Sequence, residues 1–414
     1  MLGKLAIKKL YIIGAGLAGL SAASWAIHKR NEVEMFETSS LAGGRCRSFF
    51  DKKLGTTIDN GNHLVFSANK NFYDLCELIN STNKIKVIEP NLFFFDIKNK
   101  KSWELSLSIL DFLFKNKRIP DVHLSDYLSI IKILFMSKES TIGNLKVTNN
   151  FKNYFWEPLT LAVMNTSVNS ASARILSNVL KKTILKGKKY CKIYQPLKNW
   201  NETIIEPAVN FITKGNKINF NTRLKKVEIR DNLITKLEFN NKQIQIGRDD
   251  YVISALPITA FSKIFNIIDV PKDFNTILNI HYKISPKIKK LFTRNIIGMI
   301  NSHSQWIFIK NNYLSVTVSN ANIFNDESQE TLSKRVWKEI CVLVNKNIPM
   351  PNYQIIKEKK ATFLQSPNNY ELIKKITNLP RNLLICGDWT QSDLPCTIEG
   401  SIMSGKKSIE FLGV

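Results

Sequence analysis

The chain has 414 residues, of which 44% are hydrophobic and 22% charged. This length exceeds what one hydrophobic core usually supports, and the composition is globular, so we expect two cores and little disorder. The formal net charge of +25 has two readings. It indicates either an anionic partner, with an anionic membrane ranked above nucleic acid, or an AT-rich codon bias that spreads Lys, Asn and Ile along the chain. Since no nucleic-acid-binding pattern is present, we expect no nucleic acid partner.

The cysteines and histidines indicate neither a disulfide framework nor a metal site. The six cysteines are scattered without a CxxC pair, and the five histidines lack ligand spacing, which favours a reducing compartment and no metal. Leu10–Ile27 is apolar after a basic start, but its three glycines argue against a signal peptide or anchor. We therefore expect a cytoplasmic protein, with peripheral contact at the inner face of a membrane as the open alternative.

The first elements predict a nucleotide-binding βαβ unit. Lys8–Ile13 and Val33–Phe36 are typical of short strands, and a helical pattern between them ends near Lys29. The connecting loop reads Gly14-Ala15-Gly16-Leu17-Ala18-Gly19. In such a loop the glycines permit a tight turn, close approach of a pyrophosphate and close helix packing, and the helix N-terminus binds the phosphates. Glu37, 18 residues after Gly19, is placed to bind the ribose hydroxyls of a dinucleotide, NAD or FAD.

The next motif separates these two cofactors. Gly43-Gly44-Arg45 follows Glu37 closely, and here the sequence resembles the amine-oxidase and phytoene-desaturase superfamily of flavoproteins. The resemblance implies FAD, with the second glycine loop and the arginine against its phosphates. A guanidinium suits an anionic oxygen. Asp59-Asn60-Gly61-Asn62-His63 is similar to the family's segment that leads toward the flavin ring, which implies that Asn60 and His63 lie near the flavin. A purely structural role for His63 stays open.

The region after this motif contains two short apolar segments. Leu105–Phe114 is followed by Lys115, Lys117 and Arg118, and Tyr127–Met136 is followed by Lys138. Both are too short to span a bilayer. They are either core helices or segments that dip into a membrane face with their lysines at the headgroups. We expect residues 67–194 to be mostly helical.

The middle of the chain predicts strands. Asn219–Ile229, Leu233–Asn240 and Lys242–Ile246 alternate apolar and polar residues. Tyr251–Ala255 is similar to the family's strand that returns to the flavin, and Tyr313–Val318 is a further strand candidate. By the same resemblance, the backbone of Val227 would lie against the adenine.

A second cofactor motif lies near the end of the chain. Leu383–Cys386 is typical of a buried parallel strand, and Gly387-Asp388 ends it. The resemblance implies that Asp388 binds the ribityl chain. We expect a helix to start near Thr397, so that Thr397 and Ile398 at its N-terminus meet the flavin, where the dipole favours negative charge. Small residues at every fourth position predict a face for close backbone approach: Gly400, Ser404 and Ser408. Cys396 does not match the family's flavin-tethering cysteine, so the FAD would be non-covalent.

Two blocks narrow the resemblance further. The first is Phe155-Trp156-Glu157-Pro158-Leu159 with Ala162, Met164-Asn165-Thr166 and Ala171-Ser172-Ala173. The second is Gly387-Asp388-Trp389-Thr390 with Leu394 to Gly400. Both are similar to hydroxysqualene dehydroxylases, the squalene-associated FAD-dependent desaturases, over nearly the full chain. Cys396 and the region 193–200 depart from the pattern.

The resemblance implies an α/β fold and a reaction. The expected fold consists of a Rossmann-like FAD-binding domain of the glutathione-reductase type and an amine-oxidase-like α+β substrate domain. The expected pieces are 1–66, 195–257 and 375–414 for FAD, and 67–194 and 258–374 for an isoprenoid substrate. The implied reaction is reductive dehydroxylation of hydroxysqualene to squalene, which needs an acid and a dry apolar pocket.

No catalytic residue is assigned from the sequence, and several functions stay open. Glu157, Asp59 and His63 are candidate acids, and Trp156 is a candidate π face for a cation; structural roles stay open for all four. The alternatives are a carotenoid or phytoene desaturase, a flavin amine oxidase, and a flavin-free prenyl-binding escort protein. The sequence does not indicate the oligomeric state.

Overall fold

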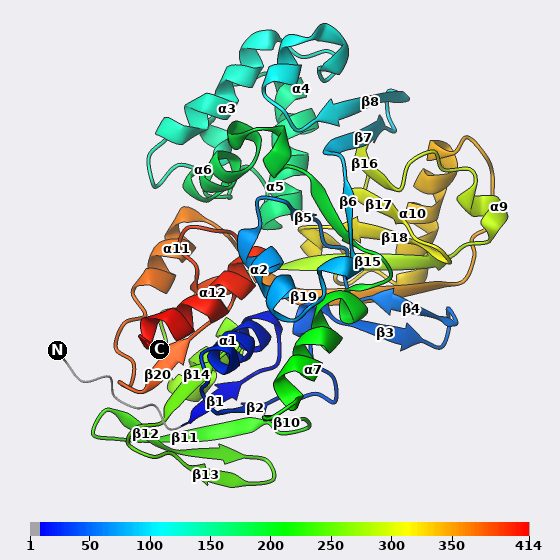
Figure 1. Cartoon of the computed structure of the whole chain (residues 1–414). Helices are drawn as coiled ribbons and strands as arrows, with labels where there is room; N and C mark the ends of the chain where they lie inside the picture. The colour runs from blue at the N-terminus through cyan, green and yellow to red at the C-terminus, as the bar shows by residue number, and fades with distance from the viewer. Residues whose placement is uncertain (1–8, 414) are drawn as a thin grey trace.

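The computed structural model describes residues 9–413 of the chain, except the side chains of Leu113 and Asn116. Figure 1 shows the lower half built on a parallel sheet, with a second sheet and a group of short helices above it. The two halves are connected by several crossings of the chain, so each half contains segments that are far apart in sequence.

The lower half is built on a five-stranded parallel sheet with the order β10-β2-β1-β14-β20. Its strands are β1 (Leu10–Ile13), β2 (Val33–Phe36), β10 (Lys217–Asn219), β14 (Tyr251–Ser254) and β20 (Leu383–Ile385). Leu10 and Ile12 pack with helices α1 (Leu17–His28), α7 (Glu206–Thr213) and α12 (Ile398–Phe411) on one face. Tyr11 and Ile13 face the other way, toward the antiparallel sheet of β11 (Leu224–Arg230), β12 (Leu233–Phe239) and β13 (Gln243–Gln245). Because both faces are covered, the central strands are continuous apolar runs.

The predicted strand over Asn219–Ile229 is wrong in its extent. β10 ends at Asn219 and β11 begins at Leu224, in a different sheet. Asn221 between them has φ 53°, a left-handed conformation that interrupts an extended strand and that asparagine tolerates better than most residues.

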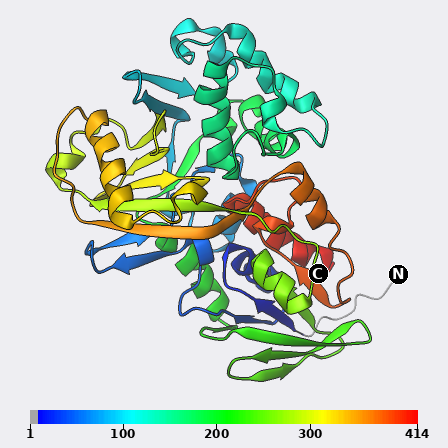
Figure 2. The same ribbon diagram turned by 180° about the vertical axis from the view of Figure 1, so that it is seen from behind.

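The second sheet has seven strands, in the order β19-β15-β18-β17-β16-β7-β8. They are β7 (Asn91–Asp96), β8 (Lys101–Ser106), β15 (Phe274–Lys283), β16 (Ile296–Ile300), β17 (Trp306–Ile309), β18 (Tyr313–Val318) and β19 (Tyr353–Phe363). One face packs against α10 (Gln329–Leu343). The other face of this sheet packs toward the rest of the molecule. Figure 2, the view from behind, shows the long strands β15 and β19 running side by side across the middle of the molecule.

Small elements join the two halves. Two hairpin-like groups are present, β3 (Ser48–Asp51) with β4 (Thr56–Asp59), and β5 (Val65–Phe66) with β9 (Ile193–Pro196) and β6 (Ile85–Ile88). The remaining helices are α2 (Lys70–Leu78), α3 (Ser129–Lys132), α4 (Asn149–Phe151), α5 (Glu157–Met164), α6 (Ala173–Lys182), α8 (Ile258–Phe265), α9 (Pro286–Lys289) and α11 (Pro367–Lys374).

Helical turns outnumber strands in residues 67–194, as expected, but the strands of this stretch were missed. This stretch contributes β6, β7, β8 and part of β9, and its helical part is divided into short α, π and 3₁₀ turns. Leu105–Phe114 starts in β8 and ends in a 3₁₀ turn at Leu110–Leu113. The aromatic residues of β7 suit a strand, in which alternate side chains are buried, and β7 pairs with β8. This sheet pairing prevails over the apolar pattern that suggested a helix.

Candidate active site

The first glycine loop has the geometry of a phosphate-binding turn. Gly14 has φ +107°, and a Cβ on Gly19 would lie 1.9 Å from the carbonyl oxygen of Gly14, so α1 packs as close to the loop as glycine permits. Gly16 is the N-cap of α1, and no side chain caps the helix there. A Cβ on Gly16 would meet nothing within 4 Å. The free N–H groups of the first turn therefore face open space, which suits a diphosphate.

The carboxylate of Glu37 lies against this loop. Its Oε2 accepts a hydrogen bond from the backbone N–H of Ala15 at 2.8 Å, and its Oε1 accepts one from Ser39 at 2.8 Å. Each oxygen retains further acceptor capacity. These contacts hold the acid at the end of β2, where a ribose would meet it.

The second glycine loop lies directly beside the first. The N–H of Gly43 donates to the carbonyl of Ala15 at 2.8 Å, and Gly16 and Gly43 form an isolated parallel bridge. Gly43 and Gly44 have φ +102° and +54°, a backbone that other residues rarely adopt. The structure therefore brings together the two glycine loops that the sequence singled out.

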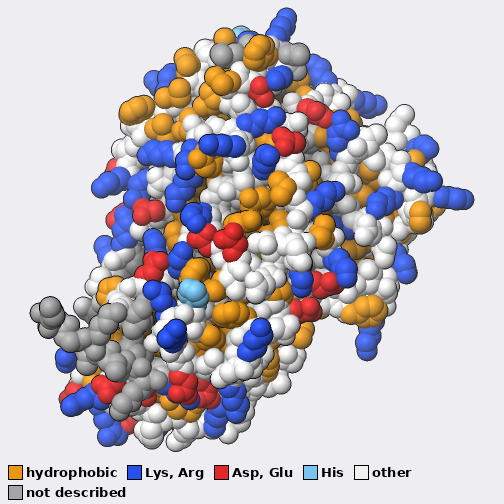
Figure 3. Space-filling view, in the orientation of Figure 1, with side chains coloured by type: hydrophobic (Ala, Val, Ile, Leu, Met, Phe, Trp, Pro, Cys, Tyr) orange, Lys and Arg blue, Asp and Glu red, His pale blue; other side chains and the backbone are white. Residues whose placement is uncertain are grey.

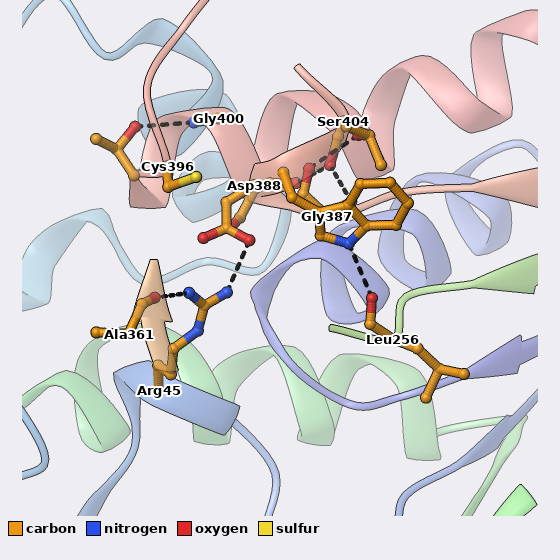
Figure 4. Close-up of polar contacts among 12 residues, drawn as sticks. Arg45, Leu256, Ala361, Gly387, Asp388, Cys396, Gly400 and Ser404 are labelled. Atoms are coloured by element: carbon orange, nitrogen blue, oxygen red, sulfur yellow. Dashed lines mark hydrogen bonds and ion pairs between the residues drawn. The ribbon is translucent and has the colours of Figure 1, made fainter. Parts of the chain in front are cut away.

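Arg45 joins the beginning of the chain to its end. Its Nη2 lies 2.7 Å from Oδ1 of Asp388, and its Nη1 donates to the carbonyl of Ala361 in β19 (Figure 4). Asp388 is buried, whereas 41% of the Arg45 side chain is accessible. The pKa of Arg45 is raised, chiefly by the charge of Asp388. Because a guanidinium carries five N–H donors, Arg45 can bind a further anionic oxygen without releasing Asp388.

The backbone around Asp388 is held by α12 and by β14's end. The N–H of Gly387 donates to Oγ of Ser404 at 2.8 Å, and Nε1 of Trp389 donates to the carbonyl of Leu256 at 2.9 Å (Figure 4). α12 begins where the sequence predicted, with Thr397 as N-cap; its Oγ1 accepts from the N–H of Gly400 at 3.2 Å. Ile398 is the first residue of α12 and packs against the core between the parallel sheet and its covering helices.

The close helix contact lies beside the predicted small-residue face and not on it. A Cβ on Gly405 would lie 2.2 Å from the carbonyl oxygen of Ala18 and 2.8 Å from the N of Ala22. α1 thus crosses α12 at Gly405, whereas Ser404 points to Gly387. Backbone does approach the predicted row, since the N–H of Gly387 donates to Ser404 Oγ at 2.8 Å and a Cβ on Gly400 would lie 2.9 Å from the carbonyl oxygen of Pro395. The sequence pattern missed Gly405, where α1 comes closest.

The segment after β4 lies between the glycine loops and the seven-stranded sheet. Asn60 Nδ2 donates to the carbonyl of Arg45 at 3.3 Å. Asp59 is 1% exposed and accepts from Ser48 and from the N–H of Trp200. Burial lowers the pKa of His63, and the charges of Asp59 and Arg45 act on it as well. His63 and Asp59 therefore lie in the same neighbourhood as Arg45.

A group of polar side chains on the sheet faces this segment, and sequence reasoning missed it. We call Asn279 and His281 of β15, with Ser315 and Thr317 of β18, the polar band. Asn62 Nδ2 donates to Ser315 and Thr317 at 2.6 and 2.9 Å, and Asn279 Nδ2 donates to the carbonyl of Asn60 at 3.2 Å. Strand alternation puts these residues on one face, but no motif marks them as functional.

His281 is the unusual member of the polar band. It is fully buried, and among the described residues neither ring nitrogen has a hydrogen-bond partner. Its ring centroid lies 5.5 Å from that of Tyr313 in an edge arrangement. Burial lowers the pKa of His281 to about 4, against a smaller opposing effect of Asp59. The imidazole is therefore neutral at physiological pH.

The remaining candidate residues lie elsewhere or are half-buried. Trp156 is 1% exposed within the apolar core, and its Nε1 donates to Ser129 at 3.0 Å. Glu157 starts α5 and accepts from the N–H of Val168 at 3.0 Å; burial raises its pKa. No hydrogen bond among the described residues links either to Asp59 or His63. Val227 is half-buried in β11.

Comparisons with known proteins agree with this geometry. The description "Flavin containing amine oxidoreductase" matches residues 189–408, and the MCRA family model matches residues 7–263. A hydroxysqualene dehydroxylase of Sinorhizobium fredii is 31% identical over 98% of each chain, and one of Zymomonas mobilis is 31% identical over 97% of this chain and 98% of the other. The chain belongs to the hydroxysqualene dehydroxylase family. It is therefore a flavin-dependent oxidoreductase of the amine-oxidase superfamily.

More distant proteins share the fold alone. A putative protoporphyrinogen oxidase of Exiguobacterium superposes with a TM-score of 0.71 at 13% identity, covering 98% of this chain and 99% of the other. Cyclohexylamine oxidase of Brevibacterium oxydans superposes with a TM-score of 0.72 at 10% identity, covering 98% of each chain. These likenesses confirm the predicted fold class, an α/β fold of the amine-oxidase type.

Proposed function

We propose that this enzyme binds FAD non-covalently and reduces hydroxysqualene to squalene. In the balanced reaction, the substrate's C–O bond breaks, its hydroxyl leaves as water after accepting a proton, and a hydride takes its place; the dihydroflavin is oxidised to FAD. The proposal is carried by the two relatives named hydroxysqualene dehydroxylase, which match this chain from end to end. It is supported by the pairing of Arg45 with Asp388, which closes the two glycine loops and α12 around one site.

The residues that would hold FAD can be assigned from the adenine end of the cofactor to the flavin ring. Glu37 would bind the adenosine ribose, and Val227 would lie against the adenine. The first turn of α1 and the second glycine loop, with Arg45, would bind the diphosphate. Asp388 would accept from the ribityl hydroxyls. These assignments place the N-terminus of the 14-residue helix α12 near the flavin ring, where its dipole favours negative charge.

Non-covalent binding is supported by the state of Cys396. Burial and the nearby Asp388 raise the pKa of its thiol well above the ordinary value. A protonated thiol is a poor nucleophile, so Cys396 is not suited to attach to the flavin.

The flavin supplies the hydride, and the protein has to provide a dry site and a proton. Asp59 and His63 are the better placed candidates for the proton, because the segment that carries them contacts Arg45, to whose carbonyl Asn60 donates at 3.3 Å. His63 would have to receive a proton in the complex, since burial lowers its pKa. Trp156 and Glu157 keep structural contacts of their own, and we rank them lower. By the same proposal, residues 1–66, 195–257 and 375–414 form the FAD domain, and 67–194 and 258–374 form the substrate domain.

A product assay tests the proposal. The purified holoenzyme is reduced under nitrogen and incubated with hydroxysqualene, and squalene is measured by gas chromatography. We expect squalene in proportion to the flavin oxidised, and a flavin that acid precipitation releases into the supernatant as FAD. Reoxidation of the flavin without squalene would refute the reaction, and flavin that stays with the pellet would refute non-covalent binding.

A carotenoid desaturase is the second candidate. A zeta-carotene desaturase of Synechocystis is 20% identical over 98% of this chain and 97% of the other. That function runs in the opposite redox direction, so the oxidised enzyme would desaturate a carotene and the reduced enzyme would not form squalene. Incubating oxidised holoenzyme with phytoene or zeta-carotene separates the two candidates, as does an amine substrate for an amine oxidase.

A further inference from the structure

The exposed apolar side chains of the molecule are concentrated in one short stretch. Among the described residues, six of the sixteen large hydrophobic side chains that are exposed lie within residues 110–135. They are Leu110 (69%), Phe114 (57%), Leu124 (48%), Leu128 (54%), Ile131 (46%) and Phe135 (83%). We call these six residues the apolar face. Figure 3 shows hydrophobic side chains gathered at the top of the molecule, over the region of α3, with lysines and arginines around them.

The spacing of these residues shows that the face is regular. Leu124, Leu128, Ile131 and Phe135 lie on consecutive helical turns, 3₁₀ and α, at intervals of four, three and four residues. Residues at such intervals share one side of a helix. The opposite side, with Tyr127, Ile130 and Ile133, is buried in the core. A helical segment that is apolar on both sides has a partner on each, and the described part of the chain supplies a partner for the inner side only.

The charges around the apolar face are complementary to an anionic surface. Residues 105–138 contain five cationic side chains, three of which are exposed lysines without an ion pair in the described chain: Lys115, Lys132 and Lys138. The three carboxylates of this stretch are each neutralised or buried. Asp111 pairs with Lys117 at 2.8 Å, Asp121 pairs with Lys101 at 2.6 Å, and Asp126 is 6% exposed and accepts from Thr148. The stretch therefore presents uncompensated positive charge next to apolar side chains.

We infer that the apolar face docks the enzyme on an anionic lipid bilayer. Its six side chains enter the acyl boundary, and Lys115, Lys132 and Lys138 remain at the headgroups. No described helix is long or apolar enough to cross a membrane, so the contact is interfacial. The core beneath the face extends through Trp156 and Trp306 to Trp389 beside the flavin site. An isoprenoid in the bilayer thus lies next to the apolar side of the enzyme; this last argument rests on the proposed function, and the surface itself does not.

Vesicle binding by the holoenzyme tests the docking surface. Wild type and variants are mixed with sucrose-loaded vesicles of phosphatidylcholine, alone or with one-third phosphatidylglycerol, and sedimented. We expect wild type to bind the anionic vesicles. The affinity of Leu110→Ser/Phe135→Ser for these vesicles should be lower by about tenfold or by a larger factor. The matched control is Ile323→Ser/Phe411→Ser, which removes side chains that are 79% and 81% exposed elsewhere, and it should bind as wild type does. Lys115→Gln/Lys132→Gln/Lys138→Gln should remove the preference for anionic lipid and the sensitivity to salt.

Three outcomes would overturn the inference. The first is equal binding of wild type and Leu110→Ser/Phe135→Ser, and the second is equal weakening by the control pair. The third is a wild-type dimer that Leu110→Ser/Phe135→Ser dissociates and the control pair does not, which would assign the face to a second copy of the chain. Flavin absorbance and circular dichroism of every variant establish that it is folded. Squalene formation in detergent is measured separately, so loss of vesicle binding with retained turnover distinguishes a failed docking surface from a failed enzyme assignment.

Discussion

The Arg45–Asp388 pair and the polar band around His281 lie at the same junction of the two halves, but their polar groups are satisfied to different degrees. Arg45 bonds Asp388 and the carbonyl of Ala361 and keeps accessible donors. His281 is fully buried, and its two ring nitrogens have no partner among the described residues. Charged groups with partners stabilise a defined geometry, whereas an unpartnered buried imidazole costs free energy. The pair therefore fits the proposed binding site, and the band fits the junction beside it.

The largest effect is expected in the first glycine loop, where two glycines have different roles. Gly19→Ala would place a methyl 1.9 Å from the carbonyl of Gly14, so α1 has to move, and we expect unfolding or a loss of about 4 kcal/mol or more. Gly16→Ala meets nothing within 4 Å, so the apoprotein should keep its melting temperature while its flavin affinity falls. Thermal unfolding of the apoproteins and flavin titration measure the two effects. Equal melting temperatures for both variants would contradict this separation.

The second prediction concerns removal of the ion pair between Arg45 and Asp388. Arg45→Met should lower flavin affinity about 100-fold, because it removes the proposed donor to the diphosphate. It also leaves Asp388 buried without its partner; since 41% of the Arg45 side chain is accessible, we expect about 2 kcal/mol of destabilisation, less than for a fully buried pair. Urea unfolding and the ratio of flavin to protein absorbance measure the two losses.

The double variant is the control for this experiment. Arg45→Met/Asp388→Asn should recover part of the stability of the apoprotein, because no uncompensated charge is left, but it should recover none of the flavin affinity. Recovery of both, or of neither, would show that Arg45 does not act on the flavin and on Asp388 separately.

The third prediction concerns acid. Burial lowers the pKa of His281 to about 4, below the ordinary value of about 6.5, so between these two values the unfolded chain binds a proton that the folded chain does not. The stability associated with His281 is complete above about pH 6.5 and is lost as the pH falls toward 4, by about 2 kcal/mol at pH 5. His281→Leu should remove this part of the pH dependence in urea unfolding between pH 7.5 and 5, with the exposed His28→Gln as control. An unchanged slope for His281→Leu would contradict the burial of a neutral imidazole.

The smallest effect is expected outside both regions. Glu157→Gln keeps an oxygen that can accept from the N–H of Val168, so kcat for squalene formation should change by less than about threefold. Asp59→Asn and His63→Gln, tested in parallel, should lower kcat more while flavin stays bound. A loss of about 100-fold or more for Glu157→Gln at unchanged flavin content would move the acid to α5.

The parts of this structure that follow from the sequence are those where local geometry restricts the residue type. A positive φ at Gly14 and Gly43 and a helix start at Thr397 are encoded within a few positions, so the glycine loops, the parallel strands and the start of α12 were predictable. The strands within residues 67–194 were not, because short apolar runs suit a strand or a helix equally, and β7 forms by pairing with β16 from a distant part of the chain. The polar band and Gly405 were missed since their roles depend on tertiary neighbours.

The single ion pair between Arg45 and Asp388 also has a consequence for biosynthesis. α1 and both glycine loops leave the ribosome early, but β20 pairs with β14, and α12 crosses α1, only after the last part of the chain has been made. Because domains fold as translation proceeds, the nascent enzyme passes through a stage in which both glycine loops have been made and Asp388 has not. If Asp388 binds the cofactor as proposed, stable loading has to wait for the completed chain, and we expect a protein shortened by its tail to purify without flavin.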